Sequence, residues 1–159
     1  MNRESRAILY NQYEILKHLD PDQAGAYEKY QTVLSSGYTQ LYDKILIHIS
    51  PDEASPDMQQ ETFDILSMFR ALNIAKRNGW VPTDEDDAKF NGFDGNNDDH
   101  YHFAAFLLDD EGLFDESSPS KNSHSIATLA RYRRMLGVWT ALEKTYELTS
   151  DEAESIIKA

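Results

Sequence analysis

The sequence of 159 residues contains no cysteine, which excludes disulfide bridges, thiolate metal sites and a cysteine nucleophile. It also contains no long apolar run. The longest, Phe103–Leu108, is six residues, whereas a membrane-spanning helix needs about 20. The first residues hold no apolar signal core, so we expect no secretory leader. These absences predict a cytoplasmic globular protein that does not bind membranes.

Basic residues are few: 15 Lys and Arg face 28 Asp and Glu, giving a net charge of −13. Twelve of the acids lie between Asp84 and Glu116, where Lys89 is the one base. This sign opposes direct binding to nucleic-acid phosphates and to anionic lipid. A divalent-cation site and a face for a basic protein partner are two functional interpretations of the segment. A solvated surface explains the same acids without a function, and we favour it.

Strand-like alternation is also missing, whereas apolar residues recur at helical spacings throughout the chain. The pattern predicts one all-α, multihelical domain over 1–159 with six to seven helices. Sub-domains 1–78 and 79–159 are an alternative division. We expect the longest helices near 56–77 and 125–145, with 79–97 mainly loop. The run Ile45–Ile49 is also compatible with a buried strand.

Several helix ends can be recognised from local signals. Ser55-Pro56 combines an N-cap side chain with a proline at the first helical position. Gly37 is suited to end a helix in the left-handed conformation. Thr149 stands three residues before Glu152, which is the spacing of a capping box. The sequence therefore predicts a helix start at 55–56, a helix end at 37 and a short terminal helix after 149.

Longer motifs run nearly from end to end of the chain. They are RAILYNQYEIL at 6–16, Leu19-Asp20-Pro21, Gly37-Tyr38, FDILSMFRAL at 63–72, FNGFDGNN at 90–97, Asn122-Ser123-His124, Tyr132–Leu136, Val138-Trp139 and Tyr146–Thr149. In these motifs the chain resembles the YfbU family of bacterial proteins. The resemblance implies a multihelical fold and a cytosolic setting in bacteria or phage, and it transfers no catalytic residue. The chain departs from the family pattern at Asn91, where the family has an acid, and at Asp98, where it has Glu.

The segment Asp94–Asp99 resembles the opening of a calcium loop, with oxygen donors at alternate positions. An EF-hand needs glycine at position six and a bidentate Glu at position twelve. Here those positions hold Asp99 and Ala105. Asp and Asn also favour turns and helix caps. We therefore predict capping, by Asn97 or Asp98, and no metal site.

We expect the loop Phe93–Asp98 to pack against Asn122–His124, because both are polar loops that precede helices, with His124 bridging them. A carboxylate that met His124 would orient its ring for acid–base chemistry. The weak catalytic candidates are therefore His124, Asp94 and Asp98. Ser123 lacks the setting of a catalytic serine. The candidate binding residues are Phe93, Asp94, Asn96, Asn97, Asp98, Asn122, Ser123 and His124.

No catalytic constellation is complete in the sequence, so the leading hypothesis is a non-enzymatic, acidic helical module that binds a protein partner or has a regulatory role, without a cofactor. Six tyrosines in the first third of the chain and the apolar pair Ile156-Ile157 suggest a homo-oligomer. Two alternatives remain open. One is a hydrolase-type enzyme using Asp94, Asp98 and His124, and the other is an acidic mimic of nucleic acid that inhibits a DNA- or RNA-handling protein.

Overall fold

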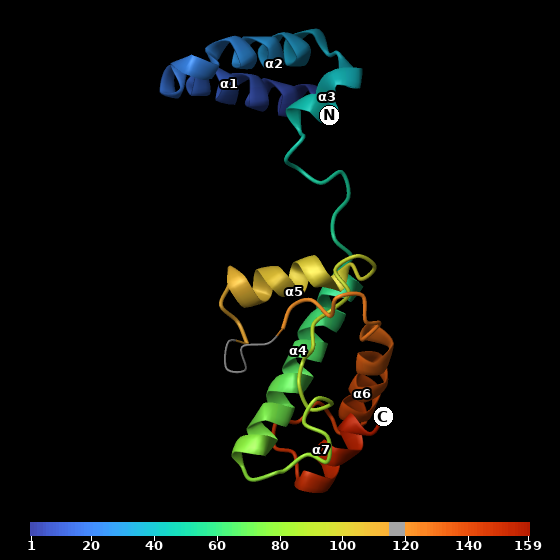
Figure 1. Ribbon diagram of the computed structural model, residues 1–159. Coiled ribbons are helices and arrows are strands. Elements are labelled where there is room, and N and C mark those ends of the chain that lie inside the picture. Colours follow the sequence, from blue (N-terminus) through green and yellow to red (C-terminus); the bar gives the residue numbers. More distant parts are fainter. Residues whose placement is uncertain (115–119) are drawn as a thin grey trace. The chain divides into compact units, whose positions relative to one another are not determined.

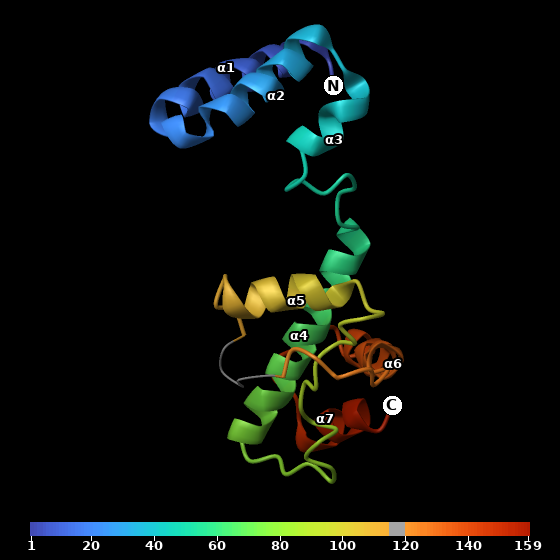
Figure 2. The ribbon, with the colours of Figure 1, turned by 45° about the horizontal axis from the view of Figure 1, so that its top comes forward.

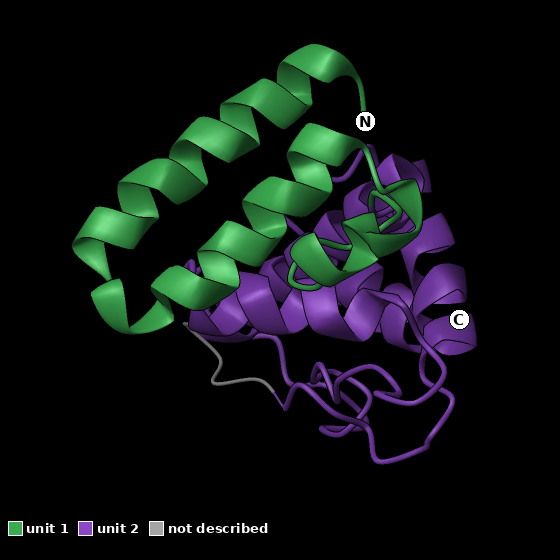
Figure 3. Cartoon of the chain, turned by 90° about the horizontal axis from the view of Figure 1, so that it is seen from above, with its two compact units in different colours: residues 1–53 green, residues 54–159 purple. Residues whose placement is uncertain are grey.

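The computed structural model describes residues 1–114 and 120–159, which form seven α-helices, two short 3-10 helices and no strand. The prediction of an all-α fold with six to seven helices is confirmed. The chain divides into two compact units, Met1–Glu53 and Ala54–Ala159 (Figure 3). The sub-domain boundary suggested at 78/79 falls inside the second unit. No helix among the described residues combines the length and apolar character needed to cross a bilayer.

Unit 1 is a helical hairpin followed by a short helix. It contains α1 (Arg3–Leu19), a 3-10 turn (Pro21–Gln23), α2 (Ala24–Ser36), a second 3-10 turn (Thr39–Leu41) and α3 (Tyr42–Ile45). As predicted, α2 ends at Gly37, which has a φ of +71°. A Cβ at Gly37 would also lie 2.9 Å from Arg6 Nη1. Glycine is therefore favoured there by the left-handed backbone conformation, whereas the end of the Arg6 side chain could move aside.

The contact between α1 and α2 is polar and aromatic. Gln31 on α2 is buried and donates to the Tyr10 carbonyl oxygen (3.2 Å) and to Glu14 Oε2 (2.9 Å). The Tyr13 ring packs against those of Tyr27 and Tyr30, with centroids 5.8 and 5.3 Å away. Three of the tyrosines that suggested an oligomer interface therefore hold the hairpin together.

The strand alternative for Ile45–Ile49 is wrong. Helix α3 ends at Ile45, and hydrogen bonds of a turn continue it, from Leu46 N to the Tyr42 carbonyl (3.0 Å) and from Ile49 N to the Leu46 carbonyl (2.8 Å). Ile47 and Ile49 are exposed. The branched residues do not form a strand, because no segment of the described chain pairs with them.

Unit 2 is built around α4 (Pro56–Arg77), which contacts α5 (His100–Asp109), α6 (Leu129–Ala141) and α7 (Ser150–Ile157). Figures 1 and 2 show α5 crossing α4 while α6 and α7 lie on its other side. The buried face of α4 carries seven of the core residues: Ile65, Leu66, Met68, Phe69, Ala71, Leu72 and Ala75. The loop between α4 and α5 adds Trp80, Phe90 and Phe93 to the same core. Segment 79–97 is mainly loop, as predicted.

Both predicted helix starts in unit 2 are confirmed. Ser55 Oγ accepts a hydrogen bond from Met58 N (3.4 Å) at the start of α4. At α7, Thr149 Oγ1 accepts from Glu152 N (3.3 Å) and the Glu152 carboxylate accepts from Thr149 N (2.8 Å), which completes the capping box. These reciprocal bonds satisfy backbone N–H groups that the first helical turn leaves unpaired.

The predicted helix at 125–145 is too long at both ends. It begins at Leu129, because residues 123–126 form a turn in which Ser123 Oγ donates to the Ile126 carbonyl (2.6 Å). It ends at Ala141, before Glu143 and Lys144, which have φ values of +56° and +53°. The second longest helix is instead α1, with 17 residues.

The C-terminal pair Ile156 and Ile157 does not form an exposed apolar patch. Both side chains are buried in the core of unit 2, where α7 packs against α4 and α6. They therefore stabilise the fold of the single chain, and any argument for self-association has to rest on other residues.

Candidate functional site

The two polar loops that we expected to meet do meet. Phe93 N donates to the Lys121 carbonyl oxygen (3.1 Å), and Ser123 N donates to the Phe93 carbonyl oxygen (2.9 Å). The two bonds form a short parallel bridge between Phe93 and Asn122. Asn96 Nδ2 adds a bond to Ser125 Oγ (3.4 Å). The loops are joined mainly through their backbones, and within 1–114 and 120–159 no hydrogen bond of the His124 ring forms the expected bridge.

Gly92 permits the close approach of the loops. A Cβ on this residue would lie 2.5 Å from Asn122 N and from the Lys121 carbonyl carbon. These are fixed backbone atoms, and Gly92 also has a φ of +84°. Only glycine fits both requirements without displacement.

The Asp94 carboxylate organises the turn that follows. The residue is 5% exposed, and its carboxylate accepts from Asn97 Nδ2 (2.6 Å) and from Asn96 N (3.0 Å). These hydrogen bonds, that of Asn97 above all, lower the pKa of Asp94 below its ordinary value. Asp94 N in turn donates to Asp98 Oδ2 (2.9 Å). The polar atoms of this loop bind one another.

The prediction that Asn97 or Asp98 caps the next helix is wrong. Helix α5 begins after Asp99, which makes no capping bond through its side chain. The Asp98 carboxylate points back to Asp94 N, and the Asn97 amide is bound to the Asp94 carboxylate. The side chains therefore close their own turn, which is the alternative that Asx residues offer to capping.

The second loop contributes one buried and one exposed residue. Ser123 is buried, and its hydroxyl donates to a backbone carbonyl in the same turn. Asn122 Oδ1 accepts from His124 N (2.8 Å). The His124 ring is exposed and makes no hydrogen bond to any described residue, including Asp94 and Asp98. The three weak catalytic candidates are neighbours in space without the carboxylate–histidine contact that acid–base chemistry would use.

Phe93 lies in the core rather than on the surface of the loop. It is fully buried, and its ring packs against Phe90 (5.2 Å between centroids), His100 (5.3 Å) and Tyr132 (5.8 Å). The Tyr132 hydroxyl donates to the Gly92 carbonyl (3.2 Å) and accepts from Asn91 N (2.9 Å). The contacts of Tyr132 and the packing of the Phe90 and His100 rings thus hold the FNGFDGNN segment (90–97) against the core of unit 2.

A second polar cluster joins three helices, and no local pattern in the sequence predicts it. The Glu61 carboxylate on α4 accepts hydrogen bonds from Nε and Nη2 of Arg133 on α6, each at 2.8 Å. It also contacts His100 Nε2 from α5 at 2.8 Å. The bidentate Arg133 contact is the main cause that lowers the pKa of Glu61. Because a carboxylate only accepts, Nε2 of His100 donates. This cluster ties α4, α5 and α6 together.

Most described acids of the segment 84–116 have partners within the chain. Glu85 pairs with Lys76 (2.5 Å), Asp87 with Arg131 (2.7 Å) and Asp109 with Lys121. Asp84 accepts from two backbone N–H groups, and Asp86 lies 3.5 Å from Lys89. With Asp94 and Asp98, seven of these acids are engaged, which leaves Asp99, Asp110 and Glu111. Asp115 and Glu116 lie outside the described residues. Among all the residues that the structure describes, no group of three His, Asp or Glu side chains is placed to hold a metal ion.

The structure therefore defines an all-α protein in which a small hairpin unit precedes a unit built around one long helix. The family model of the YfbU domain matches residues 1–159, the whole chain. The chain belongs to the YfbU family, which confirms the resemblance seen in its motifs.

Proposed function

We propose that this protein is a non-enzymatic helical protein-binding module that self-associates through unit 1. The observation that carries the proposal is the exposure of the side chains of α1 to solvent. None of its 17 residues is buried, although α2 packs along it. Three of its large aliphatic side chains are mostly exposed: Ile8 and Ile15 are each 59% exposed and Leu19 is 75% exposed.

These side chains form one stripe. Ile15 follows Ile8 by seven residues and Leu19 follows Ile15 by four, so the three share a face of α1. Leu16 extends the stripe at its edge and is 37% exposed. The residues that face α2, by contrast, include Tyr13 and Lys17, which bind its rings and its amide. The stripe has the spacing by which helices pair in coiled coils.

The small core of unit 1 also favours a partner. Its buried apolar side chains are Leu34 and Tyr42. A unit of this size usually needs further apolar burial, and oligomerisation is one common source. The exposed side chains of Ile8, Ile15 and Leu19 on one face of α1 favour an interaction surface there, with Gln12 as the polar residue between the first two.

A second copy of the chain is the occupant that fits best. A single apolar stripe is self-complementary across a twofold axis. Unit 1 carries eight acids and five bases, a net charge of −3 of the total −13. Two copies that join through unit 1 therefore bring together the less acidic part of each chain, which limits their repulsion. The engaged acids of segment 84–116 give no comparable support to the mimic of nucleic acid.

The test is the mass in solution by light scattering. We expect the wild type to have twice the chain mass of 18.2 kDa at high micromolar concentration. The variant I8E/I15E should be monomeric with an unchanged helical circular dichroism spectrum, because both positions are exposed. The matched control I126E changes an isoleucine of unit 2 that is 67% exposed and should remain dimeric. A monomeric wild type, or equal dissociation of both variants, would overturn the proposal.

A further inference from the structure

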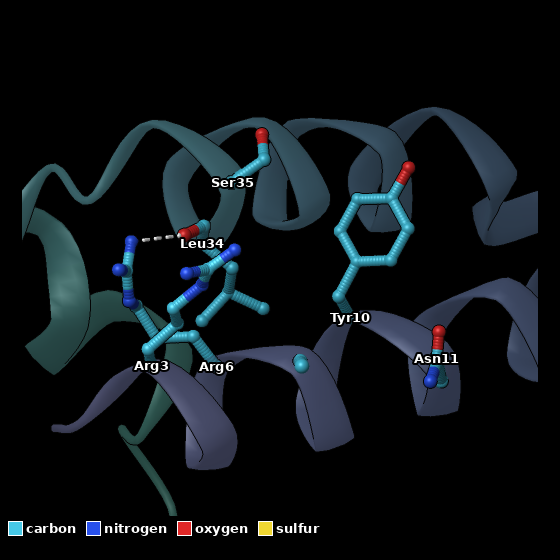
Figure 4. A pocket seen from close by; sticks show the side chains of 7 residues that line it. Arg3, Arg6, Tyr10, Asn11, Leu34 and Ser35 are labelled. Atoms are coloured by element: carbon cyan, nitrogen blue, oxygen red, sulfur yellow. Dashed lines mark hydrogen bonds between the residues drawn. The ribbon is translucent and has the colours of Figure 1, made fainter.

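A cavity of about 220 Å³ lies between the first turns of α1 and the last turn of α2. Its polar lining comes from Arg3, Arg6, Tyr10, Asn11 and Ser35, and Leu34 adds an apolar wall. In Figure 4 both arginine side chains and the Tyr10 ring project from α1 toward α2. The cavity is thus formed by unit 1 alone.

The charge of this lining is opposite to that of the protein. The chain has 28 acidic side chains, yet none of those that the structure describes lines the cavity, which holds two arginines. Arg131, Arg133 and most lysines pair with carboxylates, whereas neither Arg3 nor Arg6 is paired with an acid among the described residues. Two neighbouring guanidinium groups without a counter-ion attract an anion.

Arg6 is held in place before any ligand binds. Its Nη1 donates to the Leu34 carbonyl oxygen (2.9 Å) in the last turn of α2, and its guanidinium lies against Gly37. The carbonyl groups at a helix C-terminus favour a cation, so this contact fixes the side chain. Arg3 lies one turn earlier on α1 and makes no hydrogen bond or ion pair with the described residues. One arginine is therefore preorganised and the other is free to close on a ligand.

The number of donors points to phosphate. Each guanidinium carries five N–H donors, of which Arg6 uses one on Leu34. The hydroxyl of Tyr10 and the amide of Asn11, neither engaged by the described residues, add further donors. A phosphate monoester offers three acceptor oxygens and a charge of about −1.5 to −2, and arginine binds such groups through two parallel hydrogen bonds.

The size of the cavity limits the ligand. At about 220 Å³ it is smaller than the pockets of about 300–1,000 Å³ that take drug-sized molecules. A phosphate with a short organic group fits within this volume. The cavity also lies on a different side of α1 from the aliphatic stripe, because Tyr10 is two residues from Ile8 and so about 200° around the helix.

We propose that the cavity lined by Arg3, Arg6, Tyr10 and Ser35 binds the phosphate group of a small phosphomonoester. This site is independent of self-association. It rests on the lining, on the missing acids and on the fixed position of Arg6.

Isothermal titration of the full chain at physiological ionic strength tests the proposal. The probes are glycerol phosphate and, separately, inorganic phosphate. We expect saturable binding of glycerol phosphate by the wild type and at least tenfold weaker binding by R3Q, since this variant removes half of the positive charge and no intrachain bond. The matched control R77Q removes an exposed arginine of α4 that has no ion pair among the described residues, and it should bind as the wild type does.

A second measurement locates the site. Amide resonances of Arg3, Tyr10 and Ser35 should shift on addition of glycerol phosphate, while those of unit 2 stay in place. Tighter binding of the ester than of inorganic phosphate supports a phosphomonoester. No saturable binding, tighter binding of the free ion, equal binding by R3Q and R77Q, or shifts confined to unit 2 would each overturn the proposal.

Discussion

Gly92→Ala directly tests the contact between the loops 93–98 and 121–125. The substitution has two costs. A non-glycine residue in the left-handed region is destabilised by about 1–2 kcal/mol. The new Cβ would also lie 2.5 Å from backbone atoms of residues 121 and 122, so the loops have to separate. Separation weakens the two backbone hydrogen bonds of Phe93, which contribute about 0.5–1.5 kcal/mol each. The sum is about 3 kcal/mol.

Gly79→Ala is the matched control. Gly79 also lies in unit 2 and has a φ of +104°, but a Cβ there meets no atom within 4 Å. This variant therefore has the conformational cost alone, about 1–2 kcal/mol. The difference between the two variants isolates the close approach of Gly92 to the second loop.

Urea unfolding followed by tryptophan fluorescence measures the difference. The chain has two tryptophans, Trp80 and Trp139, and both are buried in unit 2, so the signal reports on that unit. G92A should lower the free energy of unfolding by at least 1 kcal/mol more than G79A. Equal losses in the two variants would refute the reasoning, because they would show that the two loops are not in contact at Gly92.

Three further predictions concern the polar contacts of unit 2. Tyr132→Phe should lower the free energy of unfolding by about 1–3 kcal/mol, because Asn91 N loses its hydrogen-bond partner. The hydroxyl of Tyr101 makes no hydrogen bond among the described residues, so Tyr101→Phe should change the free energy of unfolding by less than about 0.5 kcal/mol. Equal effects of the two variants in urea unfolding would contradict this prediction. Arg133 keeps the pKa of Glu61 below its ordinary value of 4.5. The ionised carboxylate therefore stabilises the fold at pH values above 4.5, and this stabilisation is lost as the pH falls through the lower pKa of the folded state. The stability difference between the wild type and Glu61→Gln should therefore be largest near neutral pH and shrink below about pH 4.5, and a constant difference in urea unfolding would count against the ion pair. Asp94→Ala should lower the free energy of unfolding by about 1–2 kcal/mol, and His124→Ala should lower it by less than about 0.5 kcal/mol. The double variant should lose the sum of the two, since no described bond joins the two side chains. A coupling energy above about 0.5 kcal/mol between the two substitutions would show a contact that the structure lacks.

Several helix ends of this protein were determined by sequence alone. The helix start at Ser55 and the capping box of Thr149 and Glu152 depend on side chains three residues from the backbone groups they satisfy, and the end of α2 depends on the left-handed backbone of Gly37. Such signals need no knowledge of the rest of the fold. The spacing of apolar residues likewise predicted an all-α chain, because helical periodicity is a property of each segment by itself.

The tertiary structure decided which partner each polar side chain takes. Asp98 and Ser123 are residue types that often cap helices. Here each side chain makes a hydrogen bond within its own turn, and the next helix begins later in the sequence. Glu61 and Arg133 are 72 residues apart, and Arg6 is 28 residues from the carbonyl that it binds. Sequence separation of this size carries no local signal. The contacts form because packing of the apolar faces of α4, α5 and α6 brings these positions together, and in unit 1 because α2 folds back along α1 and leaves the aliphatic face of α1 uncovered.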